Sequence, residues 1–204
     1  MRAPFFCSQV LVKCLSMKGD MNNLLMRASL FAEFAHRKQS REYNPEPYIV
    51  HPRRVAAHAA RLGLSDQAIA AAFLHDVLED TKTKEHELRS SFGGEVTDMV
   101  VLLSDLQKPE SGSRAQRKGR YRQRLLEYLE TIYTTRFANA TNDHVYDEVI
   151  TLKALDVIDN ARSLAGEAPE FWRVVHKEMQ EFMHDFGDYM HPKARKSFRK
   201  YLED

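Results

Sequence analysis

The chain has 204 residues, of which 43% are hydrophobic, and a formal net charge of +1 at pH 7. This length and composition suffice for one domain with a hydrophobic core, and they exclude a disordered chain. The balanced charge excludes a surface that is basic throughout, so we expect no nucleic-acid partner and only local basic sites. The only cysteines, Cys7 and Cys14, provide no disulfide framework, which is typical of a reducing compartment.

Residues 1–20 are predicted to be an extension that precedes the folded domain. Residues 5–15 are moderately apolar, but Gln9 and Lys13 interrupt them and no clear cleavage site follows, which argues against a signal peptide. No stretch approaches the roughly 20 apolar residues that a membrane span needs. We therefore expect a cytoplasmic protein without a membrane partner, whose oligomeric state the sequence does not reveal.

Helical periodicity dominates the rest of the chain, and the alternating pattern of strands is absent. Asn22 or Asn23 is suited to begin a helix, Gly63 to end one, and Ser65 to cap the next. The fold class predicted from these patterns is all-α, in one helical bundle. The predicted helices cover residues 22–35, 51–63, 65–80, 83–92, 95–106, 114–136, 143–165, 170–189 and 192–203.

Polar residues interrupt the apolar third helix at residues 72–81, which read Ala-Phe-Leu-His-Asp-Val-Leu-Glu-Asp-Thr. On one continuous helix, His75 and Glu79 lie one turn apart, and so do Asp76 and Asp80. Three carboxylates this close repel one another, and a bound metal ion would compensate their charge. The alternative is a buried, hydrogen-bonded His–Asp pair without a metal.

One helix cannot surround an ion, so other segments must contribute ligands. His51 lies at a predicted helix start, where its side chain can point out of the packing. Asp156 interrupts the apolar face of another helix, and Asn160 follows one turn later on the same face. Buried polar groups of this kind need partners, and divalent metals bind nitrogen and oxygen ligands.

Three motifs, in order, resemble a known family: Pro-Tyr-Ile-Val-His-Pro at 47–52, residues 72–81, and Lys-Ala-Leu-Asp at 153–156 with Asn160. They are similar to the HD superfamily of metal-dependent phosphohydrolases, and specifically to the hydrolase domain of RelA/SpoT proteins and the stand-alone small alarmone hydrolases. The resemblance implies an HD-type bundle over residues 21–204, with a basic insertion near residues 108–148 and additional C-terminal helices. It also implies that one Mn²⁺ ion binds to His51, His75, Asp76 and Asp156.

The same resemblance implies that Glu79 and Asp80 position and activate the water that attacks the substrate. It also implies that Arg41 and Asn160 contact the nucleotide. Residues 114–124 carry six cations and no acid, and within them Arg117 and Lys118 are our predicted phosphate contacts. A solvated helix face is the alternative for this basic segment.

The predicted function is removal of the 3′-pyrophosphate from guanosine tetra- or pentaphosphate, or from an adenosine analogue. Residues 41–48 read Arg-Glu-Tyr-Asn-Pro-Glu-Pro-Tyr, whereas the family usually has Arg-Lys-Ser-Gly-Glu-Pro-Tyr in this loop, which helps to recognise the base. Two alternatives therefore remain open. One is a phosphatase for another nucleotide, such as a phosphorylated nicotinamide cofactor, and the other is a nucleotide-binding module without catalysis.

Overall fold

The computed structural model describes residues 21–41, 45–136, 147–164 and 169–203. These ranges contain no strand, and Ser40 and Pro47 form an isolated β-bridge, so the all-α prediction is confirmed. The predicted extension at residues 1–20 lies outside the described residues. No described helix has the length and apolar character needed to cross a membrane. The helices are α2 (Met21–Ala35), α3 (Val50–Leu62), α4 (Asp66–Leu74), α5 (Val77–Asp80), α6 (Glu85–Leu103), α7 (Arg114–Arg136), α8 (Glu148–Leu164), α9 (Pro169–Phe186) and α10 (Pro192–Lys200), with 3-10 turns η1 (Pro109–Ser111) and η2 (Gly187–Tyr189).

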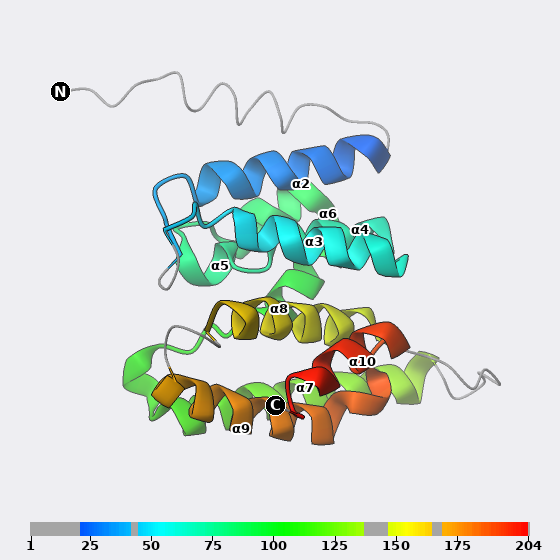
Figure 1. Cartoon of the computed structure of the whole chain (residues 1–204). Coiled ribbons are helices and arrows are strands. Elements are labelled where there is room, and N and C mark those ends of the chain that lie inside the picture. The colour runs from blue at the N-terminus through cyan, green and yellow to red at the C-terminus, as the bar shows by residue number, and fades with distance from the viewer. Residues whose placement is uncertain (1–20, 42–44, 137–146, 165–168, 204) are drawn as a thin grey trace.

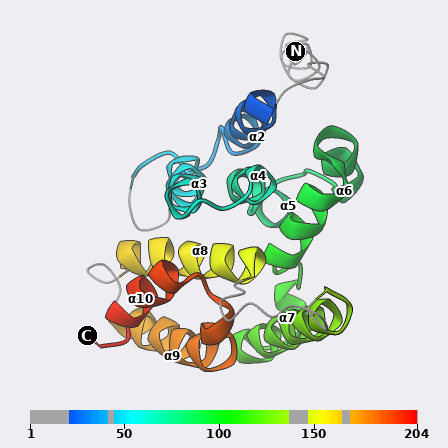
Figure 2. The same cartoon turned by 90° about the vertical axis from the view of Figure 1, so that its right-hand side faces the viewer.

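Helix α8 lies between two groups of helices (Figures 1 and 2). Helices α2, α3, α4 and α6 form one hydrophobic core with Val149, Leu152 and Leu155 of α8. Helices α7, α9 and α10 form a second core with other α8 residues, among them Ile150 and Ala154. Because α8 contributes to both cores, the carboxylates that it carries are buried and must find partners inside the protein.

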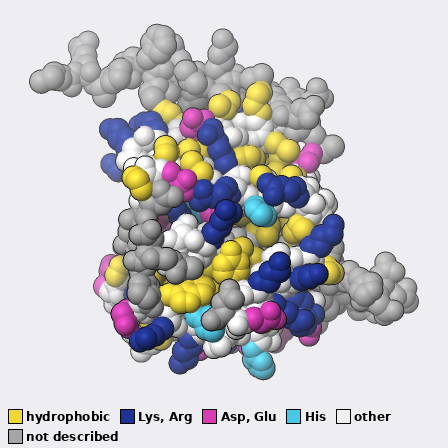
Figure 3. All heavy atoms as spheres, in the orientation of Figure 1, with side chains coloured by type: hydrophobic (Ala, Val, Ile, Leu, Met, Phe, Trp, Pro, Cys, Tyr) yellow, Lys and Arg dark blue, Asp and Glu magenta, His cyan; other side chains and the backbone are white. Residues whose placement is uncertain are grey.

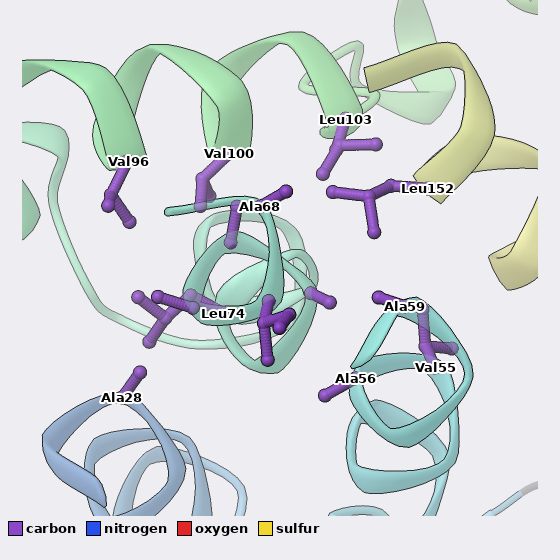
Figure 4. Packing of buried hydrophobic residues seen from close by; sticks show 14 of the residues in the cluster. Ala28, Val55, Ala56, Ala59, Ala68, Leu74, Val96, Val100, Leu103 and Leu152 are labelled. Carbon is purple, nitrogen blue, oxygen red and sulfur yellow. The ribbon is translucent and has the colours of Figure 1, made fainter. Parts of the chain in front are cut away.

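Helix α4 packs at the centre of the first core through small side chains. Ala68 and residues 70–72, all alanines, are fully buried. Figure 4 shows α4 surrounded by residues of its neighbours, including Ala28 of α2 and Ala56 of α3. Alanines on facing helices let the backbones approach closely, and larger side chains there would force the helices apart. This tight packing fixes the C-terminal end of α4, where the polar motif begins.

The prediction that one helix carries the whole motif is wrong. Helix α4 ends at Leu74 and α5 begins at Val77, so His75 and Asp76 occupy a turn between them. Two backbone carbonyls at this turn accept hydrogen bonds from side chains. The His75 ring donates to the carbonyl of Ala72, which a continuous helix would pair with Asp76, and the Ser104 hydroxyl donates to the carbonyl of His75. The turn places both polar residues at a helix junction rather than along one face.

The two helices predicted on either side of Gly93 and Gly94 are both present, and together they make up α6. They meet at a kink at Gly93, which adopts φ 84° and lies outside helical geometry, a conformation that favours glycine. Leu88, Phe92, Val96 and Val100 remain buried on both sides of this kink, so packing against the first core continues through it.

Candidate metal centre and active site

Lys and Arg side chains are prominent on the face shown in Figure 3, yet the net charge is only +1. Some of the compensating acids are buried: Asp156 is 5% exposed and Asp159 is 6% exposed. Both lie on α8, where it faces the N-terminal end of α3 and the turn between α4 and α5. Buried charges at such a junction need cationic partners.

Four predicted ligands from these three segments converge here. The Nε2 atoms of His51 and His75 lie 3.2 Å apart. Asp156 Oδ1 lies 3.1 Å from Nε2 of His51 and 3.5 Å from that of His75, and Asp76 Oδ2 lies at 3.5 Å and 3.1 Å from the same two atoms. The ligand atoms of His51, His75 and Asp76 all lie within 4.8 Å of one another. The structure therefore brings together two ring nitrogens and two carboxylate oxygens around one point.

The opposite edge of each imidazole ring is held by an acceptor. His75 Nδ1 donates to the carbonyl of Ala72 at 2.8 Å, and His51 Nδ1 donates to Asp159 Oδ2 at 2.7 Å. A neutral ring that donates through Nδ1 carries its lone pair on Nε2. Two such lone pairs would face each other beside two carboxylates, an arrangement that a cation stabilises. This donor set fits a divalent metal ion with nitrogen and oxygen ligands.

Without an ion, protons neutralise the cluster. Burial lowers the pKa of His75, but the charge of Asp76 and the hydrogen bond to Asp156 outweigh it and raise that pKa well above its usual value. Burial is likewise outweighed at His51, whose pKa is raised by Asp156 and Asp159. The pKa values of Asp76 and Asp156 are lowered, because nearby cations, His75 for Asp76 and Lys153 for Asp156, overcome burial. A metal ion must therefore displace protons from the histidines, which makes its binding depend on pH.

The gain in melting temperature on adding Mn²⁺ is expected to increase from pH 5.5 to pH 8. Raised histidine pKa values stabilise the metal-free protein below about pH 6.5, and this contribution is lost as the pH rises through the folded-state values. Lowered aspartate pKa values stabilise it above about pH 3.9 and lose their effect only at more acid pH. Mn²⁺, in contrast, binds better as protons leave. Thermal unfolding in EDTA and in Mn²⁺ across this range tests the prediction, which a gain that is constant or larger at pH 5.5 would contradict.

Asp159 contacts the edge of the His51 ring that faces away from the candidate metal centre, and it was not predicted as a site residue. Besides accepting from His51, it binds Arg54 Nε and Nη2 at 2.8 and 3.1 Å, and Arg54 Nη1 also binds Glu46 at 2.8 Å. Its position three residues after Asp156, directly following the apolar residues Val157 and Ile158, was the available signal. A carboxylate behind a metal-binding histidine fixes the orientation of the ring and its tautomer.

Asp159→Asn is expected to weaken Mn²⁺ binding about 10- to 100-fold, because the amide no longer holds the His51 ring as a carboxylate does. Isothermal titration calorimetry measures the affinity. Asp98→Asn is a matched control, because Asp98 lies on α6 and its side chain is 63% exposed. Equal affinities in the Asp159 variant and the control would refute this role for Asp159.

The predicted catalytic carboxylates lie beside the four converging side chains. The N–H of Asp105 donates to Glu79 Oε1, and burial, reinforced by the charge of Asp76 but opposed by Lys153, raises the pKa of Glu79. Burial and the charge of Asp76 likewise raise the pKa of Asp80. A raised carboxylate pKa strengthens the group as a base near neutral pH.

Tyr48 joins the two parts of the site. Its hydroxyl lies 2.8 Å from Asp76 Oδ2 and 2.6 Å from Asp80 Oδ2. The ring stacks on the buried ring of His36, with 4.7 Å between centroids. Tyr48 belongs to the first sequence motif, but its contact with both carboxylates required the fold, because residues 48 and 80 lie on separate segments.

The predicted substrate-binding residues are partly brought together. Arg41 Nη2 donates to Asn160 Oδ1 at 2.7 Å, and Asn160 Nδ2 donates to Asp156 Oδ1 at 2.7 Å. Lys118 pairs with Asp105 at 3.3 Å. Arg117 lies apart: its guanidinium donates to the carbonyls of Pro109 and Gly112, in the loop before α7. The roles of all four residues in substrate binding stay predictions.

A cavity of about 550 Å³ opens beside the cluster. Asp76, Glu79, Asp80 and Asp156 line one part of it, and α7 and α9 line another. Lys153, also in its lining, donates to Asp156 Oδ2 at 2.9 Å and was not predicted as a site residue. Arg41, Asn160 and Lys118 line the cavity, whereas Arg117 is not among its lining residues. A cavity of this size accommodates a ligand of nucleotide dimensions.

The chain is similar in sequence and fold to known proteins. The chain is 31% identical, over 194 residues, to a guanosine-3′,5′-bis(diphosphate) 3′-pyrophosphohydrolase of Aquifex aeolicus, with 95% of this chain and 25% of the relative covered. A protein of the same name from Haemophilus influenzae is 33% identical over 153 residues, which cover 74% of this chain and 20% of the relative. The chain thus spans a quarter or less of the length of these relatives.

A solved structure described as a metazoan ortholog of SpoT that hydrolyses ppGpp has a similar fold, with a TM-score of 0.62 and 21% identity, over 88% of this chain and 94% of that one. A model of the HD domain family matches residues 28–183, which include all four converging side chains and both neighbouring carboxylates. The chain therefore belongs to the HD domain family.

Proposed function

We propose that this protein is a metal-dependent hydrolase that removes the 3′-pyrophosphate from guanosine 3′,5′-bis(diphosphate) or a closely related nucleotide. The observation that carries the proposal is the convergence of the four candidate metal ligands, His51, His75, Asp76 and Asp156. Glu79 and Asp80 lie beside them, and the cavity at this point is also lined by Lys and Arg side chains. The names of the two relatives support the same activity.

His51, His75, Asp76 and Asp156 would hold one divalent ion, for which Mn²⁺ is our proposal. When bound, such an ion supplies a Lewis acid that makes a nearby water more acidic and offsets phosphoryl charge. The protein fixes these ligands through their own partners: Asp159 behind His51, the carbonyl of Ala72 behind His75, and Lys153 beside Asp156.

Asp80 and Glu79 act on the attacking water in this mechanism. Asp80 accepts its proton, and Glu79, held by the N–H of Asp105, orients it. The water oxygen bonds to the phosphorus attached to the ribose 3′ oxygen, and the bond between that phosphorus and the 3′ oxygen breaks. The leaving 3′ oxygen takes up a proton, which balances the proton that the water gave to Asp80. The products are pyrophosphate and the nucleotide with a free 3′ hydroxyl and unchanged 5′-phosphates. Arg41, Asn160 and Lys118 bind the substrate next to these groups.

Both carboxylates argue against a module that only binds nucleotides, because binding a phosphate needs no base. The base of the nucleotide is not specified by this proposal, because the loop at residues 41–48, which is expected to recognise the base, differs from the family pattern. Its ends are fixed, since Arg41 binds Asn160 and Glu46 binds Arg54, while residues 42–44 lie outside the described part of the chain.

A substrate panel tests the proposal. The Mn²⁺-loaded protein is incubated with guanosine and adenosine 3′-pyrophosphates and with a phosphorylated nicotinamide cofactor, and pyrophosphate and orthophosphate are measured separately. We expect pyrophosphate from a nucleoside 3′-pyrophosphate. If orthophosphate is released and no substrate yields pyrophosphate, the proposed reaction is refuted and the phosphatase alternative is favoured.

A further inference from the structure

The side chain of Arg54 binds two carboxylates that belong to different parts of the site. Arg54 lies on α3, three residues after His51 and on the same face of the helix, and both side chains reach Asp159 of α8. Its Nε and Nη2 atoms donate to the two oxygens of Asp159 at 2.8 and 3.1 Å, and its Nη1 atom donates to Glu46 Oε1 at 2.8 Å. One guanidinium group thus joins a carboxylate behind the candidate metal centre to a carboxylate of the loop at residues 41–48.

One end of this link is a candidate metal ligand. Asp159 Oδ2, which accepts from Arg54, also accepts from His51 Nδ1 at 2.7 Å. The Asp159 side chain is only 7% exposed, so its charge depends on these partners inside the protein. A guanidinium group that binds both oxygens of a carboxylate fixes the plane of that carboxylate. Arg54 therefore holds Asp159 in the orientation in which it fixes the His51 ring.

The other end of this link is the segment that carries Arg41. The backbone carbonyl of Glu46 accepts the N–H of Arg41 at 3.0 Å. The Arg41 side chain lines the cavity and donates to Asn160, whose amide donates in turn to Asp156, a second candidate metal ligand. The contacts therefore form a continuous path between two candidate ligands, in the order His51, Asp159, Arg54, Glu46, Arg41, Asn160 and Asp156.

We propose that Arg54 is a positioning residue that couples Arg41 and Glu46, on the nucleotide side of the site, to the candidate metal centre. An ion that fixes His51 stabilises Asp159 and Arg54 in the arrangement that holds Glu46. Contacts at Glu46 and Arg41 stabilise the metal ligands in return, because coupling between two sites is reciprocal. Binding of metal and binding of nucleotide therefore strengthen each other. This inference rests on the proposed function, since it takes the four converging side chains as metal ligands, and it adds how the two binding events depend on each other.

The affinity for Mn²⁺, measured by isothermal titration calorimetry, tests the coupling without turnover. Arg54→Gln should weaken Mn²⁺ binding about tenfold, at the lower end of the range for partners of metal ligands. Glu46→Gln should weaken it about two- to fivefold, although the Glu46 side chain binds Arg54 rather than a candidate ligand. This second loss should disappear when Glu46→Gln is made in the Arg54→Gln protein, because the path is already broken there.

Arg53 and Glu33 provide a matched control pair. Arg53 is the neighbour of Arg54 on α3 and donates to Glu33 of α2 at 2.9 Å, and both side chains are nearly half exposed. Arg53→Gln and Glu33→Gln make the same chemical changes as the two test variants. Alone and together, they should bind Mn²⁺ as the wild type does.

Hydrogen exchange at the N–H of Arg41 reports the far end of the path. This N–H donates to the carbonyl of Glu46, so its exchange requires that contact to open. Saturating Mn²⁺ should slow the exchange in the wild type, which mass spectrometry with electron-transfer fragmentation measures at single residues. The protection should be about two- to fivefold smaller in Arg54→Gln, where the path through Asn160 remains, and unchanged in Arg53→Gln.

Four results would each overturn the coupling: wild-type or tighter Mn²⁺ binding in Arg54→Gln, the same in Glu46→Gln, additive losses in the double variant, or equal protection of the Arg41 amide in Arg54→Gln and the wild type. Glu46→Gln decides the question alone if Arg54→Gln does not fold, which circular dichroism shows. If Mn²⁺ binding follows the expected pattern but no pyrophosphate is ever released from a 3′-pyrophosphate, the proposed function fails and the coupling stands. If pyrophosphate is released but any of the four results is found, the coupling fails and the proposed function stands.

Discussion

Asp80→Asn is expected to lower the turnover number on a nucleoside 3′-pyrophosphate by about 10²- to 10⁴-fold, the usual contribution of a general base. The amide cannot accept a proton from water, but it keeps the size of the side chain and an oxygen that can accept from Tyr48. Because Asp80 is not one of the four converging ligands, the Mn²⁺ affinity should stay within a few-fold of the wild-type value. Steady-state kinetics and calorimetry measure the two quantities on the same preparation.

Asp98→Asn is the matched control, since it makes the same chemical change at an exposed position on α6. It should have wild-type turnover. The wild-type protein should lose activity as the pH falls through the raised pKa values of Asp80 and Glu79, because the proposed base and its neighbour must be ionised to act on the water. Full activity of Asp80→Asn would show that another group activates the water.

His75→Gln is expected to abolish both tight Mn²⁺ binding and hydrolysis. The His75 ring provides Nε2 as one of the four candidate metal ligands. Because His75 is only 2% exposed, a solvent-exposed side chain cannot replace it as a ligand. At a Mn²⁺ concentration 100-fold above the wild-type dissociation constant, the ion stabilises the folded state by about 2.7 kcal/mol. The variant should lose this stabilisation, which thermal unfolding with and without Mn²⁺ detects.

His86→Gln controls for the substitution, because His86 is exposed on α6. This variant should keep the Mn²⁺-dependent increase in melting temperature. Circular dichroism of the metal-free His75→Gln protein shows whether the helices are intact. An intact variant that still gained wild-type stability from Mn²⁺ would place the metal away from His75.

Local signals in the sequence were sufficient for most helix boundaries. The predicted helix at 114–136 coincides with α7. Gly63 ends α3 in the left-handed conformation, at φ 75°, and the Ser65 hydroxyl caps α4 by accepting the N–H of Ala68. Each of these features depends on residues within one helical turn, which is the range over which capping and backbone preferences act.

Features that depend on distant residues were not predictable in this way. The break between α4 and α5 involves Ser104, which donates to the carbonyl of His75 from 29 positions away. Asp159 supports His51 across 108 positions, so its role became visible only when α3 and α8 were placed together. The same limit applies to the basic segment: Arg117 and Lys118 are neighbours in sequence, but the helix directs Lys118 to the cavity and Arg117 to the loop before α7. The convergence of the candidate ligands from distant segments was predicted from the three motifs and their resemblance to a family. Helical periodicity alone does not predict contacts between such segments.

Hydrolysis in ¹⁸O-labelled water tests the central claim most directly. The Mn²⁺-loaded protein is incubated with guanosine 3′,5′-bis(diphosphate), and the products are analysed by mass spectrometry. Attack of water on the phosphorus next to the ribose predicts one ¹⁸O atom in the released pyrophosphate and none in guanosine 5′-diphosphate, with no product in EDTA. Labelled orthophosphate as the only phosphate product, or equal product formation in EDTA, would contradict metal-dependent pyrophosphate release at this site.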